Sequence, residues 1–109
     1  DGASSSDIAG YLPQIGYTQR MSNVYVCEDG DTYYGEIIIQ PNVTIIYIKQ
    51  RSGTFDSMIQ STLSALLPSE AGQVWNNYLS SSSDKTFTVD GRRIVTALNG
   101  GHSQIVVYN

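Results

Sequence analysis

Hydrophobic and polar positions recur along this chain with two different periods. Between residues 17 and 50 they tend to alternate, as in β-strands, and between residues 54 and 79 they recur every three to four residues, as on one side of a helix. The alternating part includes Glu36–Ile48, which holds six isoleucines divided by Pro41-Asn42. This density of β-branched residues predicts two strands at the middle of a sheet, joined by a turn.

The first three strands are expected over residues 17–27, 33–40 and 43–50. Asp29-Gly30 lies between the first two of them, and this dipeptide is a strong hairpin signal. We therefore expect an antiparallel meander.

A pair of helices is expected over residues 54–79, with a kink at Pro68. Thr54 is a suitable N-cap for the first helix. The apolar residues of the pair fall on one side, which predicts that this side packs on the sheet. They are Phe55, Met58, Ile59, Thr62, Leu63 and Leu66 in the first helix, and Val74, Trp75, Tyr78 and Leu79 in the second.

A short N-terminal helix is expected over residues 7–15, capped by Ser6 or Asp7 and stopped at Gly16. Residues 1–6 are expected to form a flexible tail or linker, since they are rich in serine and hold one glycine.

The last quarter of the chain repeats the strand pattern. Its strands are expected over residues 85–89, 92–98 and 102–108, with turns at Asp90-Gly91 and Gly100-Gly101. The sequence therefore predicts an α+β fold: an antiparallel sheet of two three-strand meanders, a kinked helix pair (about 54–79) on one face, and the short N-terminal helix. Residues 7–109 are expected to form a single domain, and both meanders have an Asp-Gly first turn, so an internal duplication stays open.

The hairpin turns predict which residues share a sheet face. A two-residue turn at Asp29-Gly30 places Tyr25 opposite Tyr34, and an even-numbered loop at Pro41-Asn42 keeps the same parity in the next strand. The first face then holds Val24, Val26, Tyr33, Ile37, Ile39, Ile46 and Ile48, and the second holds Met21, Asn23, Tyr25, Tyr34, Glu36, Ile38, Val43, Ile45, Tyr47 and Lys49.

We expect the first, mainly aliphatic face to pack under the helices. The second face has two readings. Tyrosines offer large, rigid contact area with a polar tip and are enriched at protein interfaces, but cross-strand aromatic pairs also stabilise sheets without any ligand. The candidate binding face consists of Tyr25, Tyr34, Tyr47, Ile38, Ile45, Glu36 and Lys49.

Composition excludes several function classes. The net charge is −4, and Lys and Arg together number six, which argues against nucleic-acid binding. No apolar run approaches the ~20 residues that cross a bilayer, so no membrane insertion is expected. A polar, weakly charged composition and a lone Cys27 favour a bacterial extracytoplasmic protein, secreted or in the cell envelope. We expect Cys27 to be a buried, unreactive thiol at a strand end.

No pattern indicates catalytic, cofactor-binding or metal-ligating residues. His102 is expected at an exposed hairpin tip, and one Cys with one His does not make a zinc site. The acidic turn Glu28–Asp31 does not have the spacing of a helix–loop–helix calcium site and is expected to be a solvated tip. Trp75 is expected in the core.

These observations favour a non-enzymatic domain that binds a protein or assembles with itself. The alternative is a small-molecule or glycan-binding module with a pocket between helix and sheet. A hydrolase that uses His102 with Asp90 or a serine is a third hypothesis, which no motif supports. The expected partner is a protein or a second copy of the chain.

Overall fold

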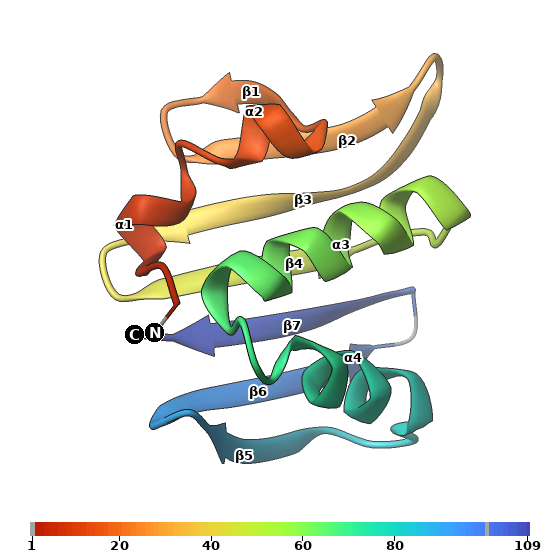
Figure 1. Cartoon of the computed structure of the whole chain (residues 1–109). Helices are drawn as coiled ribbons and strands as arrows, with labels where there is room; N and C mark the ends of the chain where they lie inside the picture. Colours follow the sequence, from red (N-terminus) through yellow and green to blue (C-terminus); the bar gives the residue numbers. More distant parts are fainter. Residues whose placement is uncertain (1, 100) are drawn as a thin grey trace.

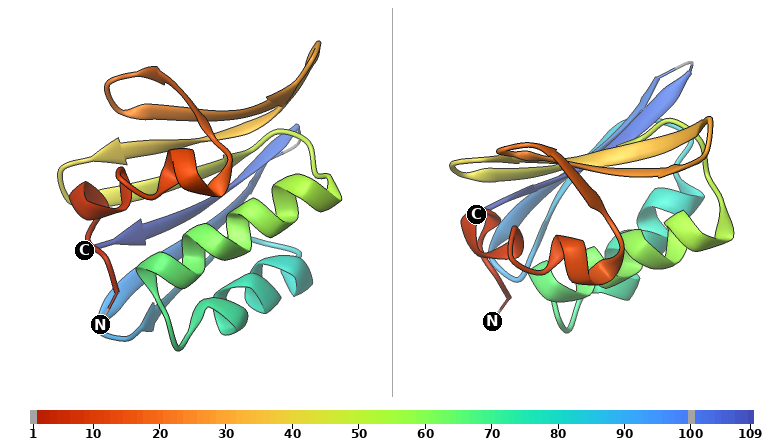
Figure 2. Two further views of the ribbon diagram at one scale, coloured as in Figure 1. Left: turned by 45° about the horizontal axis from the view of Figure 1, so that its top comes forward. Right: turned by 90° about the horizontal axis from the view of Figure 1, so that it is seen from above.

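The computed structural model describes residues 2–99 and 101–109. In this part of the chain, seven antiparallel strands form one sheet, and four helices lie on one of its faces (Figures 1 and 2). The strand order is β1-β2-β3-β4-β7-β6-β5. The helices are α1 (Ser5–Ile8), α2 (Leu12–Ile15), α3 (Gly53–Leu66) and α4 (Ala71–Ser80). The strands are β1 (Thr18–Met21), β2 (Val24–Asp29), β3 (Thr32–Gln40), β4 (Val43–Ile48), β5 (Lys85–Val89), β6 (Arg92–Asn99) and β7 (His102–Tyr108).

The predicted α+β class and the placement of the helix pair on one sheet face are confirmed. The first meander has four strands and not three, because the expected strand over 17–27 divides at Ser22-Asn23 into the hairpin of β1 and β2. The two meanders join where β4 pairs with β7, from Val43 opposite Tyr108 to Ile48 opposite Ser103.

The helix pair covers the sheet with the residues that the sequence pattern indicates. The six predicted positions of α3 are all buried, and Val74, Trp75 and Tyr78 of α4 are buried too. Leu79 is an exception, since 44% of it is exposed. The N-cap of α3 is Ser52 and not Thr54, and its hydroxyl accepts the N–H of Phe55 at 3.0 Å.

The expected N-terminal helix over 7–15 is two short helices, α1 and α2. Ser4 caps α1, and Pro13 lies in the first turn of α2, where its missing N–H costs little. Two residues of the expected tail contact the rest of the fold: the Ala3 N–H donates to the Ala65 carbonyl at 2.8 Å, and Ser5 is buried. Asp1 lies outside the described residues.

Two of the predicted turns set the register as expected. Gln40 lies opposite Val43, so Pro41-Asn42 is a two-residue turn with even parity. Ile37 and Ile46 are fully buried under the helices as a result. Asp90-Gly91 is also a two-residue turn, with the positive φ at both residues that a type I′ turn requires. The expected turn at Gly100-Gly101 lies partly outside the described residues, although Asn99 pairs with His102.

The β2–β3 hairpin differs from the prediction. Its two turn residues are Gly30 and Asp31, and a β-bulge follows, in which Cys27 pairs with Gly35 and Glu28 pairs with Tyr33. Tyr34 is the extra residue. The bulge shifts the parity of β2 by one, so Tyr25 lies opposite Ile37 and the predicted Tyr25–Tyr34 pair is wrong.

Candidate functional site

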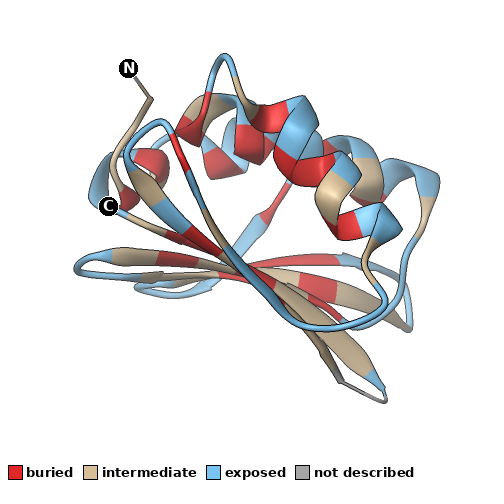
Figure 3. Cartoon of the chain, turned by 90° about the horizontal axis from the view of Figure 1, so that it is seen from below, coloured by how far each residue is buried: buried red, intermediate tan, exposed pale blue. Residues whose placement is uncertain are grey.

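The sheet face opposite the helices, called here the open face, is covered by none of the described helices (Figures 2 and 3). Because side chains alternate along strands, the residues next to the buried Ile37 and Ile46 point to this face. It is the surface that the sequence singled out, although its members differ from the prediction.

An aliphatic row crosses the open face over five adjacent strands. Its members are directly opposite one another in register: Val24, Ile38, Ile45, Val106 and Val95. At a strand spacing of about 4.8 Å, the row is about 19 Å long. Val106 is 9% exposed and the other four are half-buried, so neighbouring strands shelter part of the row from water.

An aromatic group lies beside this row and consists of Tyr33, Tyr47 and His102 on β3, β4 and β7. The ring centroids of Tyr33 and Tyr47 are 6.5 Å apart, and those of Tyr47 and His102 are 5.0 Å apart. The Tyr33 hydroxyl donates to Glu36 Oε1 at 2.5 Å. Burial and this hydrogen bond to a carboxylate both raise the pKa of Tyr33, so the phenol stays protonated and fixes the carboxylate.

The bulge explains why two predicted tyrosines are absent from the open face. Tyr25 is 5% exposed and belongs to the core, and the Tyr34 ring packs against Phe55 of α3, with centroids 6.4 Å apart. Tyr33, predicted under the helices, lies on the open face instead. Val24 and Val26 change faces for the same reason, because they pair with Ile38 and Glu36.

Four predicted residues share the open face, since the parity of the β3–β4 turn is as expected: Glu36, Ile38, Ile45 and Tyr47. Lys49 follows the last residue of β4. The diagonal pair of Glu36 with Lys49 is not among the ion pairs of the described residues, because Glu36 binds Tyr33 instead. Lys49 is exposed.

Several open-face residues were missed, although a signal for them exists. Val106, Gln104 and His102 alternate along β7, and Val95 lies on β6, so the period of two is visible in the sequence. What the sequence does not show is that β7 lies beside β4. The open face therefore extends past the first meander only in the folded chain.

The acidic turn contacts an arginine, and the single histidine lies away from Asp90. The Glu28 carboxylate pairs with Arg20. His102 and Asp90 lie at opposite ends of β6, so the structure does not bring this predicted pair together. Within the described residues, no three His, Cys, Asp or Glu side chains lie close enough to hold a metal ion.

Cys27 and Trp75 are buried, as expected. Cys27 is 7% exposed and its thiol donates to Met58 Sδ at 3.7 Å. Burial, and to a smaller extent the charge of Asp29, raises the pKa of this thiol, which disfavours the nucleophilic thiolate. Trp75 is 6% exposed, stacks on Tyr78, and carries the Arg51 guanidinium 5.5 Å above its ring.

A pocket of about 420 Å³ lies between the start of α3 and the β2–β3 hairpin. Cys27, Tyr34 and Met58 form its apolar wall, and Glu28, Asp29 and Ser52 are among its polar residues. Its size falls in the range of small-molecule sites.

No helix in the described part of the chain is long and apolar enough to cross a membrane. Comparisons with protein-family models, with curated proteins and with solved structures found no match.

Proposed function

We propose that this chain is a non-enzymatic domain that binds a protein, or a second copy of itself, through the open face. The observation that carries the proposal is the aliphatic row, which crosses five strands on a face that no described helix covers. Contiguous apolar surface of this kind typically marks an interaction site.

The aromatic group supports a protein partner in particular. Tyr33 and Tyr47 supply rigid aromatic area, and Glu36 and Gln104 supply hydrogen-bonding groups at the border of the aliphatic row. An apolar centre with a polar border is the usual layout of a protein interface. Because Glu36 is held by Tyr33, its carboxylate is already oriented before a partner arrives.

The test is a triple variant, Ile38→Thr, Ile45→Thr and Tyr47→Thr, since threonine keeps the β-branched preference for a strand while it removes apolar contact area. We expect wild-type chain to associate with itself or to retain a partner, and the variant to lose that association with its fold unchanged by circular dichroism. A matched control, Tyr11→Thr with Leu79→Thr, removes exposed apolar area on the helical side, where the two residues are 51% and 44% exposed. Equal association by wild type and triple variant would contradict the proposal.

We also propose an extracytoplasmic, bacterial setting, which the composition supports and the fold does not address. The chain has only six basic residues, and its one cysteine is buried, so the described fold holds together without a disulfide.

A small-molecule-binding module is the second candidate, and the pocket between α3 and the β2–β3 hairpin supports it. The proposed test is thermal unfolding with a panel of monosaccharides and amino acids. We expect a ligand of this pocket to raise the Tm of wild type but not of Thr54→Trp, which adds an indole to the pocket lining. Ser57→Trp, outside the pocket lining, is the control. A panel without effect on wild type argues against this candidate.

A further inference from the structure

The two edges of the sheet are built differently. At one edge, β1 has four residues, its pairing with β2 is interrupted by a register shift between Gln19 and Met21, and Arg20 pairs with Glu28. Short length, irregular pairing and charge are the devices that keep an edge strand from pairing with another chain. The β1 edge is therefore protected.

At the other edge, β5 lacks most of these devices. Its five residues pair with β6 without a register shift, from Lys85 opposite Thr96 to Val89 opposite Arg92. The strand contains no proline, and its centre is Thr86-Phe87-Thr88, which are residues that favour strands. Within the described chain β5 has one neighbour only, so the backbone N–H and C=O groups of its outer edge are free to pair.

The helix beside this edge carries no charge. None of the ten residues of α4 is charged, and Gln73 and Asn77 lie on the side that faces β5. With Lys85, Thr86, Phe87 and Thr88 they line a groove of about 360 Å³. Depletion of charged residues is typical of the centre of protein interfaces.

We propose that β5 pairs antiparallel with β5 of a second copy of this chain, about a two-fold axis through Phe87. Residues directly opposite one another in an antiparallel pair share a sheet face. Phe87 points to the helical side, because it pairs with the buried Ile94. Thr86 and Thr88 point to the open side, because they pair with Val95 and Arg93. A two-fold axis keeps each side chain opposite one on the same sheet face only if it passes through a residue of β5. An axis through Phe87, the middle residue, pairs all five residues of the strand.

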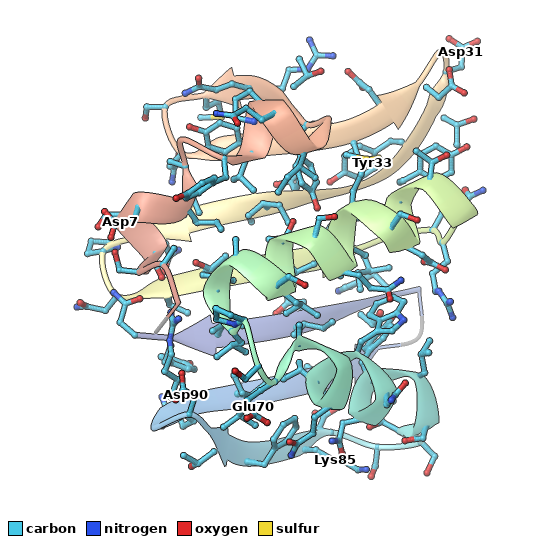
Figure 4. The ribbon with its side chains drawn as sticks, viewed as in Figure 1. Asp7, Asp31, Tyr33, Glu70, Lys85 and Asp90 are labelled. Carbon is cyan, nitrogen blue, oxygen red and sulfur yellow. The ribbon has the colours of Figure 1, made fainter. Side chains whose placement is uncertain are left out.

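The cross-strand pairs that this axis creates are favourable ones. Phe87 meets Phe87 of the second copy beside the groove, and Thr86 meets Thr88 twice on the open side; aromatic pairs and threonine pairs both stabilise sheets. Lys85 packs its methylene chain on Val89 of the second copy and places its ammonium beside Asp90. Figure 4 shows Lys85 and Asp90 at opposite ends of β5. The two-fold axis therefore places Lys85 of each copy near Asp90 of the other copy.

The acidic groups at this edge allow the pairing. Asp84 comes opposite Asp90 of the second copy, but Asp84 Oδ1 accepts the backbone N–H of Leu98 at 2.8 Å and is therefore turned toward β6. Lys85 lies between the two carboxylates and screens them from each other.

This pairing ends at a dimer. It joins two seven-stranded sheets into one continuous sheet whose remaining edges are both the protected β1. An isologous contact about a two-fold axis is closed, so it does not propagate into a filament.

The test measures molecular mass by sedimentation equilibrium up to about 1 mM chain, because a small interface of this kind binds weakly. Thr86→Lys with Thr88→Lys places like charges opposite each other twice, and we expect the dimer dissociation constant to rise about tenfold. Thr86→Glu with Thr88→Lys places opposite charges there, and we expect the dimer to be restored. Thr18→Lys with Gln19→Lys on β1 is the matched control and should leave the dimer unchanged.

Cross-linking checks the register. In an oxidised, equimolar mixture of Thr86→Cys and Thr88→Cys chains, random pairing would give the mixed disulfide as about half of the total, and we expect the mixed disulfide to exceed that half clearly. The buried Cys27 serves as an internal control. A monomeric wild type at every concentration, equal dissociation constants for the two charge variants, or a random distribution of disulfides would each overturn the proposal. The two proposals are separated by combining the variants: the open-face triple variant should keep the β5 dimer, and any association left in Thr86→Lys with Thr88→Lys should disappear only when the open-face substitutions are added.

Discussion

At the scale of single residues, Gly35 on β3 occupies a position with no room for a side chain. A Cβ built on Gly35 would overlap the Tyr47 carbonyl oxygen of β4, and would lie 2.7 Å and 2.8 Å from two ring carbons of Phe55, the fully buried aromatic residue of α3. The missing side chain therefore makes room both for the backbone of β4 and for Phe55. Gly35 directly follows the bulged Tyr34, whose ring packs on the same Phe55.

Gly35→Ala should lower the free energy of unfolding by about 3 kcal/mol, because the methyl group overlaps both the Tyr47 carbonyl and the Phe55 ring, so that β4 and α3 must shift. Urea denaturation measures the effect. Gly72→Ala is the matched control: it lies in α4 with nothing within 4 Å of the new methyl group, and it should raise stability by about 0.5–1 kcal/mol. Equal stability of Gly35→Ala and wild type would show that neither the backbone of β4 nor Phe55 needs the space.

At the scale of elements, α3 begins at a cap that the sequence pattern placed two residues too late. Both Ser52 and Thr54 are N-cap residues by type. Ser52 has extended backbone angles and accepts from Phe55 N, whereas Thr54 already lies inside the helix. The pattern locates a helix better than its first residue, because several neighbouring side chains can cap it.

Ser52→Ala should cost about 1 kcal/mol of stability, since the N–H of Phe55 loses its partner at the end of α3. Thr54→Ala is expected to stay within about 0.5 kcal/mol of wild type, because Thr54 is exposed. Chemical denaturation of the two variants side by side decides between the caps. A larger loss for Thr54→Ala would refute the assignment.

At the scale of the whole molecule, Arg92 holds three distant segments together. Its Nε donates to the Tyr108 carbonyl at 2.8 Å, and its Nη1 donates to the carbonyls of Ala3 at 3.0 Å and Leu66 at 2.8 Å. Its Nη2 donates to Asn109 Oδ1 at 3.2 Å. Burial lowers the pKa of Arg92, and the charge of Asp90 opposes this shift. The guanidinium thus joins the two chain ends to the end of α3.

Arg92→Ala should lower the free energy of unfolding by about 3 kcal/mol, since it leaves backbone carbonyls without their charged donor. Hydrogen exchange should also become faster at Ala3, whose N–H bonds to Ala65. Arg93→Ala is the control: Arg93 is exposed and lies 4.0 Å above the Tyr108 ring, and its loss should cost less than about 1 kcal/mol. Similar losses for the two variants would contradict the role given to Arg92.

The sequence by itself determined most of the elements and half of the open face. The helices α3 and α4 and the strands β3 to β7 follow from periodicity and turn residues, which act over a few neighbouring positions. Ile38, Ile45 and Tyr47 were placed on the correct face because the turn at Pro41-Asn42 is short and local.

Only the tertiary structure decided the rest of that face. The bulge at Tyr34 moves Tyr25 into the core and Tyr33 out of it, and it occurs where Tyr34 packs on Phe55, some twenty residues away in the chain. The pairing of β4 with β7 likewise joins segments more than fifty residues apart and extends the aliphatic row to Val106 and Val95. Both features depend on contacts between distant segments, and local patterns carry no information about such contacts.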